Sequence, residues 1–179
     1  MRTAKEPQIK GVGRMPVFHK TIPVNSPHGI YFEDVTDKVA SIVAEAGIKD
    51  GIVVVFSQHT SCSVLIQEDS EGETYAKIPL ILQDTINCLE KIIPDCKYEG
   101  QYLHPGPYHT SQAFELRGEL NAWCLNTDGH IRSSLLGRSE SIPLLDGKMT
   151  LGEFGRIYFA DLDQTRPRER TVRVQIVGE

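Results

Sequence analysis

Three histidines that lie far apart in the chain, His59, His104 and His130, are the side chains best suited to chemistry. His59 lies in QHTS, directly after the apolar run IVVVFS. We therefore expect it at the mouth of a buried strand, where the sheet fixes its backbone and solvent reaches its ring. His104 and His130 lie in YLHPGP and NTDGHIRSS, at the edges of turn-rich stretches. Three neutral imidazoles that converge could bind Zn²⁺ or a similar ion and leave one position open for substrate.

The spacing of these histidines does not by itself show that they converge, because their separations match no local zinc motif. A lone histidine such as His59 can also simply end a strand and make local hydrogen bonds. Nucleophilic catalysis by the nearby Cys62 is disfavoured. Its separation from His59 is odd, so the two side chains diverge if the strand continues through HTSC.

The elements that must position these residues follow from apolar periodicity and from turn residues. We expect strands at 15–24, in IVVVFS, in SVLI, as a hairpin of SESIPL and KMTL, in RIYFADLD and in TVRVQIVG. One helix is predicted from Tyr31 to Ala46. A second begins at the capping box of Ser70 and Glu73 and ends before Pro94, with Pro79 in its first turn or at a kink. This order indicates an α+β protein, with two main helices on a mainly antiparallel sheet.

The stretch between Cys96 and Leu125 has no steady periodicity and is predicted to be a long surface loop with one short helix. After it, HIRSSLLG is expected to form one or two helical turns that end at Gly137.

Length and composition limit the class of protein. The chain has 179 residues, of which 40% are hydrophobic and 24% charged, with a net charge of -5. We expect one domain over residues 15–179, preceded by a loose arm over 1–14. The acidic balance disfavours a nucleic-acid partner, and no apolar run is long enough to span a membrane. The four cysteines form no CxxC pair and the N-terminus is unlike a signal peptide, so reduced thiols and a cytoplasmic location are predicted.

Six elements, in order, resemble the YjbQ family, whose members are known as secondary thiamine-phosphate synthases. They are QHTS (58–61), IQED with Glu68, YLH (102–104), Asn126-x-Asp128-x-His130 running into SSLLG, IPLLDGKMTLGEF (142–154), and Asp161-x-Asp163 with Arg166 and Arg168. The resemblance covers roughly residues 15–179, and the order and number of the elements make it specific.

The resemblance implies a YjbQ-like α+β domain that assembles as a homotrimer, with a metal or anion site at His59, His104 and His130. The metal would be a divalent ion, Zn²⁺ or Mg²⁺. His59, Glu68 and His130 would be catalytic. Residues expected to bind a small phosphorylated substrate, or to orient the groups that do, are Thr60, Ser61, Asn126, Asp128, Ser133, Arg166 and Arg168.

Several of these residues have specific expected roles. Asn126 and Asp128 would orient the ring of His130. Arg166 and Arg168 would hold a phosphate, together with the backbone amides of a turn that begins at Ile131.

Each of these assignments has a structural alternative. RPRER (166–170) can be a solvated connector between two strands. Asp128 can cap the short helix that follows it. Glu68 can be a surface acid at the end of a strand.

The chain departs from the family pattern at two places. Phe154 and Gly155 replace the tryptophan and glutamine that many members carry, which removes any contact made by that amide. The span from His104 to His130 is lengthened by an insert at about 105–124, which contains His109 and Trp123. The insert can form a lid or extend a subunit interface, and the apolar content of FELRGELNAWCL favours a segment that packs.

Two functions of different class follow. The first is a synthase that joins hydroxymethylpyrimidine pyrophosphate to thiazole phosphate and releases pyrophosphate. The second is a trimer that binds a metal or ligand without catalysis, or that acts with a metal on another phosphorylated small molecule.

Overall fold

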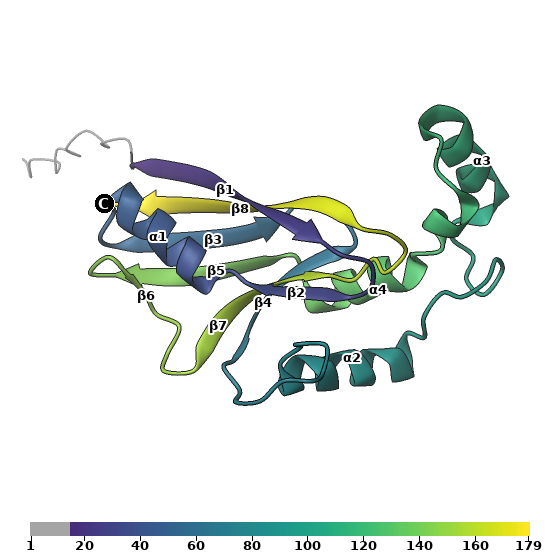
Figure 1. The fold of residues 1–179 in the computed structure, drawn as a ribbon. Coiled ribbons are helices and arrows are strands. Elements are labelled where there is room, and N and C mark those ends of the chain that lie inside the picture. Colours follow the sequence, from purple (N-terminus) through teal and green to yellow (C-terminus); the bar gives the residue numbers. More distant parts are fainter. Residues whose placement is uncertain (1–14) are drawn as a thin grey trace, which may run out of the picture.

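Two antiparallel sheets form the framework of the protein (Figure 1). The computed structural model describes residues 15–179, so the arm predicted over 1–14 lies outside the described residues. The five-stranded sheet has the order β1 (Val17–Ser26), β8 (Arg168–Gly178), β3 (Gly51–Ser57), β5 (Ser139–Leu145), β6 (Lys148–Met149). The three-stranded sheet has the order β2 (Tyr31–Asp34), β7 (Gly155–Asp161), β4 (Cys62–Glu68).

The helices are α1 (Thr36–Ala46), α2 (Leu80–Ile92), α3 (Gly106–Arg117) and α4 (Thr127–Leu136), with a 3₁₀ turn at Asn121–Cys124. None of the helices within residues 15–179 combines the length and the apolar character needed to cross a membrane.

The three-stranded sheet is buried on both faces, because its side chains alternate between two cores. Val64 and Phe159 pack on one side, in a core shared with α1 and the five-stranded sheet. Leu65 and Tyr158 pack on the other side, in a core shared with Leu82 of α2. This double burial explains why β4 and β7 are apolar without a polar alternation.

Helix α4 lies close against the ends of β4 and β7. A Cβ atom added to Gly129 would come within 2.6 Å of the carbonyl oxygen of Leu162. The hydroxyl of Ser133 donates to the carbonyl oxygen of Cys62 at 2.6 Å. Arg132 is fully buried and donates to the carbonyl of Ile93 at the end of α2. These contacts fix the helix that carries His130.

The α+β fold with antiparallel sheets is confirmed, but several element predictions are wrong. The first helix begins at Thr36, because Tyr31–Asp34 pair with β7 as a strand. The second begins at Leu80 after Pro79, so Ser70 and Glu73 do not form its capping box.

The one short helix expected in the long surface loop is α3, which has 12 residues. The helical turns expected in HIRSSLLG belong to α4, which begins earlier, at Thr127, and ends before Gly137 as predicted. IVVVFS and SVLI form strands as predicted, but in different sheets, because residues 58–61 carry the chain from one sheet to the other.

Replacing Gly129 with alanine is expected to lower the free energy of unfolding by about 1–3 kcal/mol, because the new methyl group would overlap the carbonyl of Leu162. In an exposed helix the same change stabilises the helix by up to about 1 kcal/mol. A lower free energy of unfolding would therefore come from the contact with Leu162 and not from helix propensity. Urea unfolding measures the difference, with exposed Ser134→Ala on α4 as the control. A Gly129→Ala protein as stable as the unsubstituted chain would contradict this packing.

Candidate functional site

A polar hollow of about 280 Å³ lies where the ends of several strands meet the start of α4. Strand β3 ends at Ser57 and β4 begins at Cys62, while β7 ends at Asp161 and β8 begins at Arg168. Polar side chains that follow or begin these strands therefore gather at one place. The hollow is lined by Gln58, His59, Thr60, Ser61, Asn126, His130, Asp163, Arg168 and Arg170.

Two ion pairs hold the arginines that line this hollow. Arg170 donates to both carboxylate oxygens of Asp161, from Nε at 2.7 Å and from Nη2 at 3.0 Å. Arg168 Nη2 lies 2.7 Å from Asp163 Oδ2, which also accepts from the side-chain amide of Asn126 at 3.0 Å.

The charge of Asp163 is stabilised by its neighbours. Burial alone would raise its pKa, but hydrogen bonds from Thr165 and Asn126 and the charge of Arg168 outweigh this effect and lower the pKa. The carboxylate is therefore ionised at neutral pH and holds Arg168 in position.

His59 is held in one tautomer by the backbone of β8. Its Nε2 atom accepts the N–H of Thr171 at 3.1 Å, so the proton of the neutral ring lies on Nδ1. Burial lowers the pKa of His59, and the charge of Arg170 lowers it further. At neutral pH His59 is an uncharged ring with one N–H to donate.

A second hollow of about 660 Å³ adjoins the first, because Thr60 and His130 line both. It contains His104 and His109, and the ring centroid of His104 lies 5.6 Å from that of His130 and 5.1 Å from that of His109. The insert thus brings a fourth histidine, His109, to the site. The sequence pattern predicted no role for this residue beyond its place in the insert.

His104 is also held in one tautomer. The hydroxyl of Thr127 donates to the carbonyl oxygen of His104 at 2.8 Å, so at 2.9 Å it can only accept from the ring Nδ1–H. The bare nitrogen is therefore Nε2. Burial lowers the pKa of His104, and the neighbouring His130 and His109 add to this effect.

The three predicted metal ligands do not form a metal site in this arrangement. Within residues 15–179, no three His, Cys, Asp or Glu side chains are grouped so that they could hold an ion together. His59 directs Nε2 to a backbone N–H, whereas His104 and His130 meet edge to face in the neighbouring hollow. The rings share a site without the convergence that coordination requires.

Glu68 is separated from the other predicted catalytic residues. Glu68 is exposed at one end of β4, and Cys62 lies at the other end. They are six residues apart, which corresponds to about 20 Å at the rise per residue of a strand. Gly155 pairs with Glu68 and so lies equally far from the hollow. The departure at Phe154 and Gly155 therefore does not change the site within this subunit, and the alternative of Glu68 as a surface acid fits the structure.

Asn126 and Asp128 have roles other than orienting the ring of His130. The amide of Asn126 donates to Asp163. Asp128 is buried, accepts from Gln164 at 2.9 Å and lies 3.4 Å from Arg132. Both residues stabilise the scaffold, and Asp128 is not the side-chain cap of α4, whose N-cap residue is Asn126.

Ser133 and Ile131 also differ from expectation. The buried hydroxyl of Ser133 serves the packing of α4, so it is not available to a substrate. Ile131 lies inside α4 rather than at the start of a turn, because the helix begins at Thr127. The amides that follow Ile131 therefore belong to the helix.

The two arginines that were predicted to bind phosphate, Arg166 and Arg168, have different surroundings. Arg168 lines the polar hollow. The Cζ atom of Arg166 instead lies 4.2 Å from the ring centroid of Trp123, and its Nη2 lies 2.8 Å from Oε1 of Glu119. These two contacts tie Arg166 to the insert. Because β8 begins at Arg168, most of RPRER is strand and not a solvated connector.

Cys62 is no nucleophile in this site. Its thiol is buried beside the carboxylate of Asp161. Burial strongly raises the pKa of Cys62, and the negative charge of Asp161 raises it further.

The fold agrees with the comparisons to known proteins. The family described as UPF0047 protein YjbQ-like matches residues 20–179, so the chain belongs to this family. A UPF0047 protein of Methanothermobacter thermautotrophicus is 30% identical over 92% of this chain and 95% of its own length. Another, from Methanocaldococcus jannaschii, is 33% identical over 82% of this chain and 84% of its own.

Solved structures resemble this one over nearly their whole length. A YbjQ-like protein of unknown function from Sulfolobus solfataricus has a TM-score of 0.70 at 23% identity, covering 93% of this chain and all of that one, and so shows the fold. An uncharacterized YjbQ/UPF0047 protein from Clostridium acetobutylicum has a TM-score of 0.66 at 29% identity, over 88% and 98% of the two chains.

The rings of His59 and His104 are expected to titrate below the ordinary histidine value of about 6.5, which NMR measurement of the ring protons against pH would detect. Because the unfolded chain then binds protons that the folded chain does not, the stability from these groups is present above about pH 6.5 and is lost as pH falls through their folded pKa values. A midpoint for His59 above the ordinary value would contradict its placement beside Arg170.

Proposed function

We propose that the protein is an enzyme that acts on a phosphorylated small molecule in the polar hollow. The observation that carries this proposal is the state of Arg168. Its side chain lines the hollow and is 20% exposed, while its Nη2 is anchored by Asp163. The part of the guanidinium that Asp163 leaves free can donate charge-assisted hydrogen bonds to a phosphate oxygen in the hollow.

The neighbours of Arg168 favour an anion of this kind. His59, whose neutral ring carries its proton on Nδ1, and His130 both line the same hollow. Arg170 contributes less, because its Nε and Nη2 already donate to Asp161 and Ser61. Arg168, His59 and His130 are therefore the groups that we assign to substrate binding.

The particular reaction that we propose is secondary thiamine-phosphate synthesis. A ring nitrogen of thiazole phosphate forms a bond to the methylene carbon of hydroxymethylpyrimidine pyrophosphate. The bond from that carbon to the pyrophosphate oxygen breaks, and its electron pair leaves with pyrophosphate. Donors fixed around the departing oxygens stabilise the charge that develops on them, which is the contribution expected of Arg168 and the histidines. A Mg²⁺ ion that arrives bound to pyrophosphate would need none of these histidines as ligands.

Replacing Arg168 with glutamine, or His130 with alanine, is expected to lower the rate of thiamine phosphate formation from the two precursors by about 100-fold, as when one charge-stabilising donor is removed from an active site. Arg156→Gln is a matched control, because Arg156 pairs with Asp34 near the far end of β7. Rates that fall no further in Arg168→Gln and His130→Ala than in Arg156→Gln would remove the proposed active site. Binding of pyrophosphate without turnover by the unsubstituted protein would instead support a ligand-binding role.

Assembly as a homotrimer is part of the same proposal and follows from the family resemblance. Light scattering coupled to gel filtration is expected to give three times the mass of one chain. The mass of a single chain at micromolar concentration would contradict it.

A further inference from the structure

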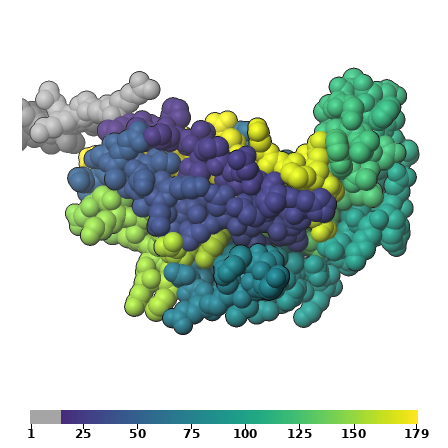
Figure 2. Space-filling model, in the orientation of Figure 1, coloured from purple at the N-terminus to yellow at the C-terminus, as the bar shows by residue number. Residues whose placement is uncertain are grey.

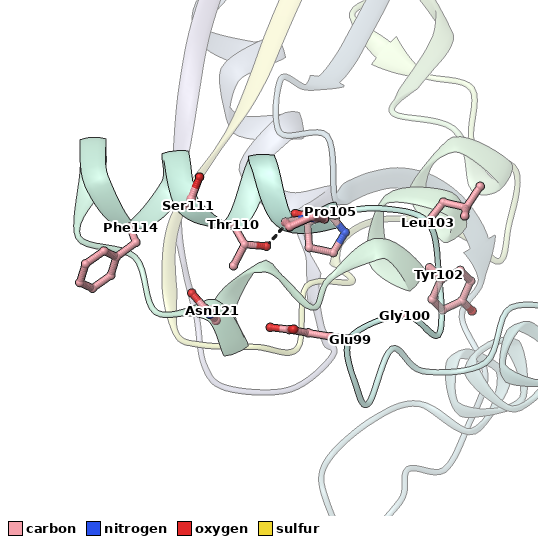
Figure 3. A pocket seen from close by; sticks show the side chains of 11 residues that line it. Glu99, Gly100, Tyr102, Leu103, Pro105, Thr110, Ser111, Phe114 and Asn121 are labelled. Atoms are coloured by element: carbon pink, nitrogen blue, oxygen red, sulfur yellow. Dashed lines mark hydrogen bonds between the residues drawn. The ribbon is translucent and has the colours of Figure 1, made fainter.

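The insert forms one wall of a third hollow, of about 720 Å³, between α3 and the segment that precedes it (Figure 3). Tyr102, Leu103 and Phe114 contribute the apolar part of its lining, and Glu99, Thr110 and Asn121 contribute polar atoms. In the space-filling view the insert rises in green at one end of the molecule, beside the yellow segment of β8 (Figure 2).

Each of the three hollows shares lining residues with the next. Thr60 and His130 belong to both the polar and the histidine-lined hollow. Tyr102 and Leu103 belong to both the histidine-lined hollow and the one beneath α3. A ligand in the polar hollow can therefore extend past His130 and Leu103 to the insert.

The chemical character changes along this path. Arg168 provides a positive charge at one end. The middle contains His104, whose lowered pKa keeps the ring neutral, and Leu103, whose side chain is fully exposed. At the far end Phe114 is 60% exposed, and among the described residues that line this hollow Glu99 alone is charged.

The insert is fastened to the loop that leads into β8, whose first residue is Arg168. The carboxylate of Glu119 pairs with Arg166, and the ring of Trp123 stacks against the guanidinium of Arg166. The ring of His109 lies against that of His104. The wall beneath α3 is thus fixed relative to the polar hollow, with only Pro167 between Arg166 and Arg168 in the chain.

We infer that the ligand of this chain is an organophosphate with an uncharged aromatic or alkyl part, which extends from the polar hollow over Leu103 to α3. The charges set the orientation, because Arg168 attracts the phosphate and Glu99 repels it. Covering Leu103, Tyr102 and Phe114 removes apolar surface from water, which favours a ligand with an apolar part. The inference rests on the proposed function only in placing the anion at Arg168.

Titration calorimetry with inorganic phosphate and with 1-naphthyl phosphate tests this inference. The naphthyl ester is expected to bind at least about tenfold more tightly, because its ring covers exposed apolar surface. Leu103→Ser should remove most of this difference without weakening the binding of phosphate. The variant should fold, because the Leu103 side chain is exposed. Leu116→Ser is the matched control, an exposed leucine on α3 outside the lining of the three hollows.

The outcomes separate this inference from the proposed function. Equal affinities for the two ligands, or an equal effect of Leu103→Ser and Leu116→Ser, would overturn the extended ligand and leave the anion site standing. Arg168→Gln should weaken the binding of both ligands by the same factor. Unchanged binding of both ligands by Arg168→Gln would overturn the anion site on which the proposed function depends, and with it the orientation inferred here.

Discussion

The buried ion pair between Asp161 and Arg170 is the interaction on which the site depends. Asp161 is the last residue of β7, where it pairs with the first residues of β2 and β4, and Arg170 lies in β8 of the other sheet. The pair thus joins the two sheets where the chain passes between them. Removing one partner of such a pair leaves an uncompensated charge and costs about 3–5 kcal/mol, so both residues are constrained together.

The loop between these two residues positions the rest of the site. Asp163 anchors Arg168 beside the polar hollow, and Arg166 fastens the insert through Glu119 and Trp123. Burial and then the charge of Arg170 lower the pKa of His59 and keep its ring uncharged, and the N–H of Thr171 fixes its tautomer. Anion binding, the state of the histidine and the position of the insert therefore all depend on this short stretch of chain.

Residues that look alike in the sequence serve different parts of the molecule. His59, His130 and Arg168 line the polar hollow, whereas Ser133 and Asp128 stabilise α4. Arg166, only two residues from Arg168, points to the insert instead, and Glu68 lies at the opposite end of its strand. Spacing along the chain could not separate these roles, because each depends on a partner more distant in sequence or on the direction of a strand.

Within residues 15–179 the sequence by itself predicted the class of fold and every strand except β2, because burial periodicity and turn residues are local properties. The family resemblance supplied most of the polar residues at the site. The sequence also determined that QHTS would follow a buried strand. Only the tertiary structure decided that the strands on either side of QHTS join different sheets, that His109 adjoins His104, and that Thr171 sets the tautomer of His59. Local patterns report how deeply a residue is buried but not which distant residue it meets, and the chemistry of this site depends on those meetings.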